Sequence, residues 1–530
     1  MHSVDANTEA MIRSVLAYAE NRLRLDPVPL DEGARDPAVL DAALDGLLGD
    51  LPHLPDQVLG VYASCLAPAV ISADSPRFLG FIPAAPTKAA LLFDMLVSCA
   101  SIQGISWLEA AGAIQAENQV LRLIADRAGL PAAAGGCFVS GGSAGNLSAL
   151  LVAREAAKRR AGDGAAGRRW RVAVSTDAHS SIASTLRILE MDPLTVHTDD
   201  HRLTGAALRA AIDSDGDPSS LAAAVATSGT TNAGIIDDLA GVAAVCRELG
   251  MWFHVDGAYG GAGLFAPSVR RAYDGIEHAD SFIVDPHKWL FAPFDCAALI
   301  YRDPALARSV HRQDASYLDV IHGDPAEWNP TDYAYHLTRR ARGLPLWFSM
   351  AVNGLDAYRD AVEAGLAIAR RGAALIYRQP NLAKAVHTQD ASYLAVLHSE
   401  NPEEWNPSDY AYHLTRRARG LPLWFSMAVY GLDAYRDAVE AGLAIALRAS
   451  ELITETPHTE LVRPPGLSVV LFRRRGWASE QYTRWADQLL HDQVAFIPPS
   501  AWEGETVARF AFLHPHTSMD LVREILDRMR

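Results

Sequence analysis

Short β-branched runs alternate with Ala/Leu-rich helical segments between about residues 78 and 302, and this alternation limits the possible folds more than any other feature of the sequence. The runs that we expect to form strands are 171–175, 222–227, 252–255, 281–284 and 296–301. Strands that alternate with helices are typical of α/β domains with a mostly parallel sheet. The sequence therefore predicts a large α/β domain at 78–302.

Two flanking segments have different patterns. Residues 1–77 are predicted to be a helical segment, because a helix at 8–24 would place its apolar residues on one face. Residues 450–530 contain two expected strands, 467–472 and 507–513, each followed by helical sequence. This pattern predicts a small α+β domain at the C-terminal end.

The region 303–449, between these domains, belongs to a tandem repeat of residues 297–372 and 373–449. Trp328–Ala369 recurs as Trp405–Ala446, with differences only at Thr331/Ser408 and Asn353/Tyr430. Solenoid proteins repeat a unit many times at 20–50 residues, and this chain has only two copies at a longer period. We interpret the repeat as a recent duplication of one segment or an error of assembly.

The composition excludes several classes of protein. With 47 Lys and Arg against 63 Asp and Glu, the net charge of −16 repels phosphate backbones, so we expect no nucleic-acid partner. No apolar run approaches the ~18 residues that a membrane helix needs, and no secretory signal is visible at the N-terminus. The five scattered cysteines form neither a disulfide framework nor a zinc site. Their spacing suits a reducing cytoplasm.

The turn after the expected strand 281–284 presents His287 and Lys288. A lysine at the end of a strand is usually solvated. Lys288, however, lies between a strand that should be buried and the apolar residues 289–291. Burial lowers the pKa of a lysine and makes its amine a usable nucleophile for a Schiff base.

Two further strands are associated with candidate binding groups. The strand 252–255 places Asp256 at its carboxyl end, where a buried carboxylate needs a cationic or donor partner. A protonated pyridine nitrogen is one such partner, and a helix cap or a structural ion pair is the alternative. The Gly-rich segment 138–147, with Gly142 and Ser143, opens a helix and is a candidate phosphate cradle. It matches neither a P-loop nor G-x-G-x-x-G, and many helices begin with Gly and Ser.

His179 and Thr231 also follow expected strands. His179 would either stack on a flat cofactor ring or cap the next helix. A lysine, a carboxylate, a phosphate cradle and an imidazole at one sheet edge together indicate a pyridoxal phosphate site.

With these residues the sequence resembles the group II pyridoxal-phosphate-dependent amino-acid decarboxylases, which include aromatic-amino-acid, histidine and glutamate decarboxylases. The motifs that carry the resemblance are Asp-Pro-His-Lys-Trp at 285–289 and His-Val-Asp-Gly-Ala-Tyr at 254–259. The resemblance implies an α/β, fold-type-I transferase-like architecture with a mostly parallel seven-stranded sheet in the large domain. It further implies bound pyridoxal 5'-phosphate, an amino-acid substrate and a cytoplasmic homodimer whose N-terminal segment packs across the two-fold interface.

The resemblance also implies a role for individual residues. Lys288 matches the Schiff-base lysine, and Asp256 matches the partner of the pyridinium nitrogen. Tyr317 matches a loop tyrosine that delivers a proton to the α-carbon of the substrate, and Tyr393 is its duplicate. The other implied cofactor contacts are His287, the stacking His179, Ala258 against the ring, Gly142 and Ser143 at the phosphate, and Thr231. No metal ligand is implied. Asp285 stands where many members have Asn.

Other functions remain open at this point. An aminotransferase or another lyase of the same fold would use the same cofactor, with Arg509 the nearest candidate to hold a substrate carboxylate. A folded but inactive homologue, disrupted by the duplication, is the second alternative. The segments 78–83 and 105–107 resemble substrate-side segments of the aromatic-amino-acid decarboxylases, and an apolar lining suits an aromatic side chain. These residues would serve equally well in a core.

The repeat raises a question of its own, because this fold has one place for the segment. Looping out one copy in the polar stretch 322–330 costs only loop closure, which grows slowly with length. We therefore expect Tyr317 near Lys288 and the helix 421–445 in the core. Residues 323–399 would then lie outside the core.

Overall fold

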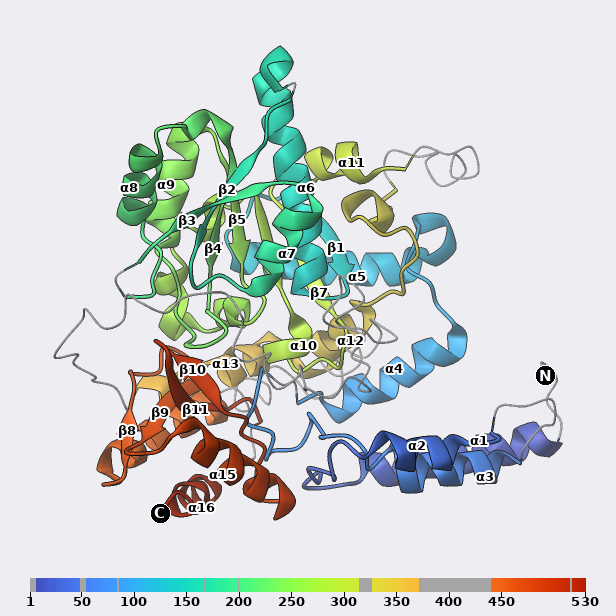
Figure 1. Cartoon of the computed structure of the whole chain (residues 1–530). Coiled ribbons are helices and arrows are strands. Elements are labelled where there is room, and N and C mark those ends of the chain that lie inside the picture. Colours follow the sequence, from blue (N-terminus) through green and yellow to red (C-terminus); the bar gives the residue numbers. More distant parts are fainter. Residues whose placement is uncertain are drawn as a thin grey trace.

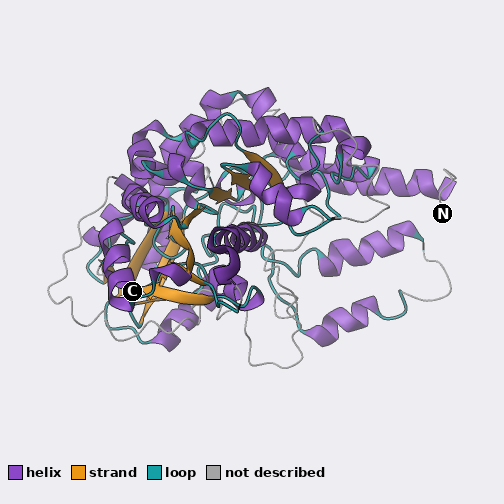
Figure 2. Cartoon of the chain, turned by 90° about the horizontal axis from the view of Figure 1, so that it is seen from above, coloured by secondary structure: helices purple, strands orange, loops and turns teal. Residues whose placement is uncertain are grey.

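The structure is a computed structural model, and it describes residues 6–47, 54–82, 85–165, 167–198, 200–313, 327–370, 440–514 and 517–530. The chain forms a helical N-terminal segment, a large α/β domain and a smaller domain with its own sheet (Figure 1). Seen from above, the strands lie among helices, and the three N-terminal helices extend to one side of both sheets (Figure 2). These helices are α1 (Ala6–Leu23), α2 (Pro37–Leu44) and α3 (Pro55–Val61).

The large domain is built on a seven-stranded sheet with the order β1-β7-β6-β5-β4-β2-β3. Its strands are β1 (Gly135–Val139), β2 (Arg171–Ser175), β3 (Asp192–Val196), β4 (Leu221–Thr227), β5 (Trp252–Asp256), β6 (Ser281–Val284) and β7 (Ala297–Tyr301). Only β7 runs antiparallel to its neighbours, β1 and β6. The four remaining neighbouring pairs are parallel. This arrangement confirms the predicted mostly parallel seven-stranded sheet.

Helices cover both faces of this sheet, as parallel sheets require. Alternate strand residues point to opposite faces, so Phe253 and Val255 belong to one buried apolar cluster and Trp252 to another. Helices α6 (Gly142–Ala161) and α7 (Ser180–Ile188) pack in the cluster of Trp252. The cluster of Phe253 receives α5 (Trp107–Arg127), α8 (Gly205–Asp215) and α9 (Leu239–Leu249).

The smaller domain contains an antiparallel sheet with the order β10-β11-β9-β8. Its elements are β8 (Thr459–Leu461), β9 (Val469–Arg474), α15 (Ser479–His491), β10 (Ser500–Trp502), β11 (Glu505–Ala511) and α16 (Met519–Asp527). The expected strands 467–472 and 507–513 correspond to β9 and β11. Each is followed by a helix, as the sequence pattern predicts.

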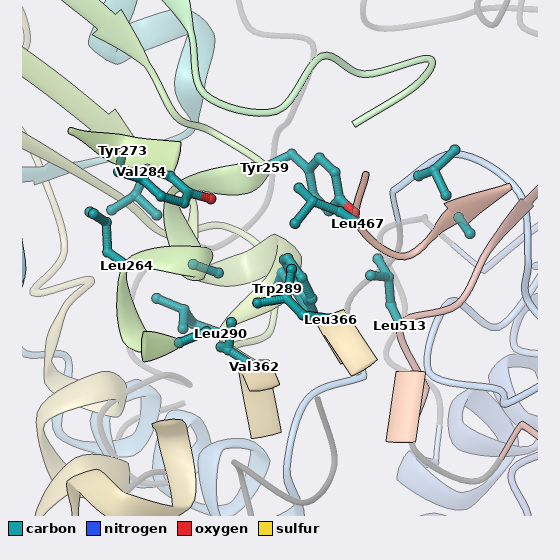
Figure 3. Close-up of a cluster of buried hydrophobic side chains, with 14 of the residues drawn as sticks. Tyr259, Leu264, Tyr273, Val284, Trp289, Leu290, Val362, Leu366, Leu467 and Leu513 are labelled. Atoms are coloured by element: carbon teal, nitrogen blue, oxygen red, sulfur yellow. The ribbon is translucent and has the colours of Figure 1, made fainter. Parts of the chain in front are cut away.

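The first copy of the repeat packs in the core, so the predicted ordering of the two copies is wrong. Trp328 donates a hydrogen bond to the carbonyl of Gly136 at 3.0 Å, and its ring lies over Gly135, where a side chain would collide with it. The helices α12 (Leu344–Asn353) and α13 (Leu355–Arg370) follow. Figure 3 shows Val362 and Leu366 of α13 in the same apolar cluster as Trp289. Trp289 is the residue that follows Lys288 in the sequence.

A buried ion pair also holds the first copy in place. Arg339 contacts Glu117 of α5 at 2.7 Å, and both side chains are only 1% exposed. The backbone N–H of Gly343 donates to the other oxygen of Glu117 at 2.6 Å. The second copy carries the same residues at these positions, Arg416 and Gly420, so the contacts do not themselves choose between the copies. The loop-closure argument ended the first copy in the polar stretch 322–330, and the structure continues it through α13. Tyr317, Tyr393 and most of the helix predicted at 421–445 lie outside the described residues.

The described part of the first copy ends in α13, and the described part of the second copy begins in a helix at 440–455. Leu366 on α13 and its duplicate, Leu443 on the helix at 440–455, are both fully buried. Deleting residues 364–440 joins Glu363 to Ala441 and leaves one copy of this helical sequence. We expect this variant to fold and to bind pyridoxal phosphate with no loss in the midpoint of thermal unfolding, measured by circular dichroism.

A second deletion controls for the choice of junction. Removing residues 327–403 gives a chain that differs from the first variant only at Thr331/Ser408 and Asn353/Tyr430. The two variants should therefore behave alike. Unfolded protein in both cases would mean that the fold depends on the second copy.

Candidate active site

A cavity of about 370 Å³ opens at the carboxyl ends of the central strands. Eight of the nine residues that the sequence predicted for the site line it: Gly142, Ser143, His179, Thr231, Asp256, Ala258, His287 and Lys288. The ninth, Tyr317, lies outside the described residues. The carboxyl ends of neighbouring parallel strands meet at one edge of a sheet, which is why residues from distant parts of the chain gather here.

Lys288 lies on the short helix α10 (Pro286–Trp289), directly after β6. Its side chain is 23% exposed, and its Nζ lies 3.0 Å from Oδ2 of Asp285. The same carboxylate oxygen accepts a hydrogen bond from the backbone N–H of Gly142 at 3.0 Å. Asp285 therefore connects the candidate nucleophile to the first residue of α6.

Asp256 ends β5 and lies 5% exposed at the wall of the cavity. Its Oδ2 accepts a hydrogen bond from the side-chain amide of Asn146 at 2.9 Å, and its Oδ1 accepts one from the N–H of Ala258 at 3.1 Å. Both donors fix the orientation of the carboxyl group. Asp256 therefore presents an oriented carboxylate to the cavity.

His179 caps α7, which is one of the two roles that the sequence left open, and it also lines the cavity. Its Nδ1 accepts a hydrogen bond from the N–H of Ser181 at 3.1 Å. Burial, reinforced by the positive charge of Lys288, lowers the pKa of His179 to about 4. The imidazole is therefore neutral at pH 7, and its proton lies on Nε2.

The residues present fit pyridoxal phosphate. The cavity combines a primary amine, an oriented carboxylate, a neutral imidazole and the start of a 20-residue helix. A side chain at Gly142 would come within 3.0 Å of Ala258 Cβ and 3.2 Å of Asp285 Oδ2, so only glycine leaves this corner open. The buried Oδ1 of Asp285 has no hydrogen-bond partner among the described residues and remains available to a ligand.

Sequence reasoning missed Asn146, which also lines the cavity. It lies one helical turn after Gly142, so the two residues share a face of α6. That spacing was the available signal. Sequence reasoning also missed Phe294, because no motif marks it.

A histidine near the site joins the two domains. His201 contacts Asp177 at 3.0 Å through Nδ1 and Glu503, between β10 and β11, at 2.8 Å through Nε2. Burial opposes the charged form, but the hydrogen bonds and charges of the two carboxylates outweigh it and raise the pKa of His201. A raised pKa in the folded state adds stability below the unfolded pKa of about 6.5, and this stability is lost as pH rises through the folded value.

We therefore expect His201→Gln to lower the midpoint of thermal unfolding more at pH 6 than at pH 9. Glutamine keeps a polar side chain but carries no charge to pair with the carboxylates. Glu503→Gln, which removes one carboxylate, should give a smaller pH-dependent loss. An equal loss at both pH values in His201→Gln would show that the charge of His201 adds no stability.

The fold and the groups around the cavity define a pyridoxal-phosphate-binding protein of fold type I. Residues 40–387 match the family described as the pyridoxal-dependent decarboxylase conserved domain. The chain therefore belongs to the pyridoxal-dependent decarboxylase family, as its motifs predict, and pyridoxal phosphate is the cofactor of that family.

Similar proteins from other organisms support the assignment to this family. An aromatic-L-amino-acid decarboxylase of Bacillus atrophaeus is 32% identical over 304 residues, which cover 56% of this chain and 62% of the relative. Tryptophan decarboxylase 1 of Oryza sativa subsp. japonica is 30% identical over 328 residues, which cover 58% and 64%. The matched part is thus less than two thirds of the length of either relative.

A solved structure shares the fold. The Oryza sativa TDC, solved with PLP and tryptamine, matches with a TM-score of 0.78 and 22% identity over 100% of this chain and 99% of that one. Within the described residues, no helix is both long and apolar enough to cross a membrane. No group of three or more His, Cys, Asp or Glu among them would hold a metal ion.

Proposed function

We propose that the protein decarboxylates an L-amino acid to the corresponding amine and carbon dioxide, with pyridoxal phosphate as cofactor. The observation that carries the proposal is that Lys288, Asp256 and His179 line one cavity. The cofactor supplies an electron sink for the bond that breaks when carbon dioxide leaves. Lys288 would hold the cofactor covalently, Asp256 its ring nitrogen, and the neutral His179 the face of its ring.

An aromatic side chain is the substrate group that the cavity favours. Phe78, Phe81, Ile82 and Phe294 contribute an apolar lining on the substrate side. Aromatic and aliphatic walls of this kind suit an aromatic side chain. The segment 105–107, which the sequence also suggested for this role, does not line the cavity; Trp107 begins α5 instead.

The aminotransferase alternative is less well supported. Arg509, the candidate for binding a substrate carboxylate, lies on β11 and is 4% exposed. It does not line the cavity, and its guanidinium donates a hydrogen bond to the carbonyl of Phe81. Arg509 therefore supports the backbone next to the cavity instead of facing a substrate.

A substrate screen tests the proposal. The protein, loaded with pyridoxal phosphate, is incubated with each of the twenty amino acids, L-dopa and 2,4-diaminobutyrate, and carbon dioxide is measured. We expect the highest release from an aromatic amino acid. Formation of a keto acid without carbon dioxide would favour the aminotransferase. Bound cofactor with neither product would favour an inactive homologue.

We also propose a homodimer in the cytoplasm. Of the sixteen large apolar side chains that are markedly exposed in the described residues, fourteen lie between Met11 and Leu108, mainly on α1–α3 and on α4 (Lys88–Ala100). Exposed apolar side chains concentrated in one part of the chain support a protein interface there. The five cysteines are free, as suits a reducing compartment.

Sedimentation velocity at micromolar concentration should therefore show a dimer. Replacing Ile12 and Leu16, which are 46% and 51% exposed on α1, with Asp should shift the protein toward monomer. The matched control is Ile188→Asp, an equally exposed residue on α7. A monomeric wild-type protein would contradict the proposed assembly.

A further inference from the structure

A chain of buried hydrogen bonds runs from β5 to the start of α6. Trp252 donates through Nε1 to Oγ of Ser281 at 2.8 Å. Ser281 Oγ is also 2.8 Å from Nδ1 of His254, and Nε2 of His254 is 2.8 Å from Oδ1 of Asn146. Ser281 is 1% exposed, and His254 and Asn146 are fully buried, so solvent does not compete for these bonds.

The two ends of the chain of hydrogen bonds fix its direction. An indole N–H only donates, so Ser281 accepts from Trp252. At the other end, Oδ1 of Asn146 only accepts, so Nε2 of His254 donates to it and Nδ1 of the neutral ring accepts the proton of Ser281. Burial lowers the pKa of His254 to about 4, although the charge of Asp256 opposes this, so the ring is neutral at pH 7. Its single proton therefore lies on Nε2 and is donated to the oxygen of Asn146.

At Asn146 the chain of hydrogen bonds divides and continues to two residues that line the cavity. Its amide nitrogen donates to Oδ2 of Asp256 at 2.9 Å and to Oγ of Ser181 at 3.1 Å. Ser181, which accepts from Asn146, lies 2.9 Å from Nδ1 of His179 and donates its proton there. The oxygen of Asn146 and both of its N–H groups are thus in use.

We infer that Asn146 is a positioning residue, which holds in place the carboxylate of Asp256 and, through the hydroxyl of Ser181, the neutral ring of His179. The inference rests on the proposed function, because only a bound cofactor would use both effects. An amide at this position supplies a donor toward Asp256 and an acceptor toward His254 at the same time. No charge is added at a site that already holds Asp256 and Asp285.

Asn146→Asp gives the sharpest test. A carboxylate at position 146 still accepts from His254 but faces Asp256 with a like charge. The affinity for pyridoxal phosphate, titrated onto the apoprotein at pH 8, should fall about tenfold to a hundredfold, as expected when a charged group loses a hydrogen bond. When the pH is lowered toward 5.5, a carboxylic acid at position 146 regains a proton to donate. The ratio of variant to wild-type dissociation constants should then shrink.

The other titratable groups around position 146 are His254 and Asp256 on β5, His179 before α7, and Asp285 and Lys288 at α10. Both the variant and the wild-type protein contain these groups, so a change in the ratio of their dissociation constants with pH reports on position 146. Asn146→Ala, which has no proton to regain, should weaken binding equally at both pH values. Ser148→Ala, a fully buried position on the same helix that bonds to Ala144, should leave the affinity unchanged.

The outcomes separate this inference from the proposed function. A wild-type protein that binds the cofactor and releases carbon dioxide, with Asn146→Asp indistinguishable from Ser148→Ala, overturns the inference alone. A pH-independent loss in Asn146→Asp, equal to that in Asn146→Ala, also overturns it, because packing would then explain the defect. A wild-type protein that binds cofactor but yields no carbon dioxide overturns the proposed function and leaves the binding test intact.

Discussion

Lys288→Ala should abolish carbon dioxide release and the covalent attachment of pyridoxal phosphate, while the protein remains folded. Lys288 is the lysine that lines the cavity, and its side chain is 23% exposed, so its removal leaves no gap in the core. Alanine also favours the helical conformation of α10. The measurement is reduction with borohydride, followed by mass spectrometry of the labelled peptide.

The small number of lysines makes the result of this experiment easy to interpret. The chain has only four lysines, at positions 88, 158, 288 and 384. Lys158, near the end of α6, pairs with Glu155 at 2.8 Å and is 39% exposed, so Lys158→Ala is a matched control that should keep full attachment. Cofactor that is still trapped by borohydride in Lys288→Ala would contradict the assignment of Lys288.

The sequence predicted most of the central sheet because its strands consist of apolar, often β-branched residues. The expected strands 171–175 and 281–284 coincide with β2 and β6. The strands β1 and β3 were missed, since Gly135-Gly136 and Asp192-Pro193 are residues that strands disfavour. Both lie in the sheet because tertiary pairing overrides local propensity: β1 pairs with β7, and β3 with β2.

The same reasoning explains the outcome at the candidate site. Lys288 and Asp256 were predictable because they directly follow strands whose carboxyl ends converge. Asn146 was not singled out from the sequence, because it lies inside a helix and its role depends on His254, which is 108 residues away. The choice between the repeat copies was equally out of reach, because Trp405 duplicates Trp328 and the sequence gives either tryptophan the same fit over Gly135.

Asp256→Asn should preserve the fold and still bind pyridoxal phosphate at saturating concentration, but it should lower turnover by about a hundredfold or more. Asparagine has nearly the same shape, and its oxygen still accepts from the N–H of Ala258, which now donates to Oδ1 of Asp256 at 3.1 Å. The negative charge that would keep the ring nitrogen of the cofactor protonated is lost. Each 1.4 kcal/mol of lost transition-state stabilisation costs a factor of ten in rate.

A partly buried carboxylate at the other end of the same strands controls for general damage. Asp280 precedes β6, and its Oδ2 accepts from the N–H of Phe253 near the start of β5 at 2.8 Å. Asp280→Asn therefore tests the loss of a partly buried charge away from the cavity, and its turnover should stay close to that of the wild type. Near-normal turnover in Asp256→Asn would show that Asp256 orients α6 through Asn146 and does not act on the cofactor. A defect in Asp256→Asn alone, measured at saturating pyridoxal phosphate, places the missing charge at the reacting ring.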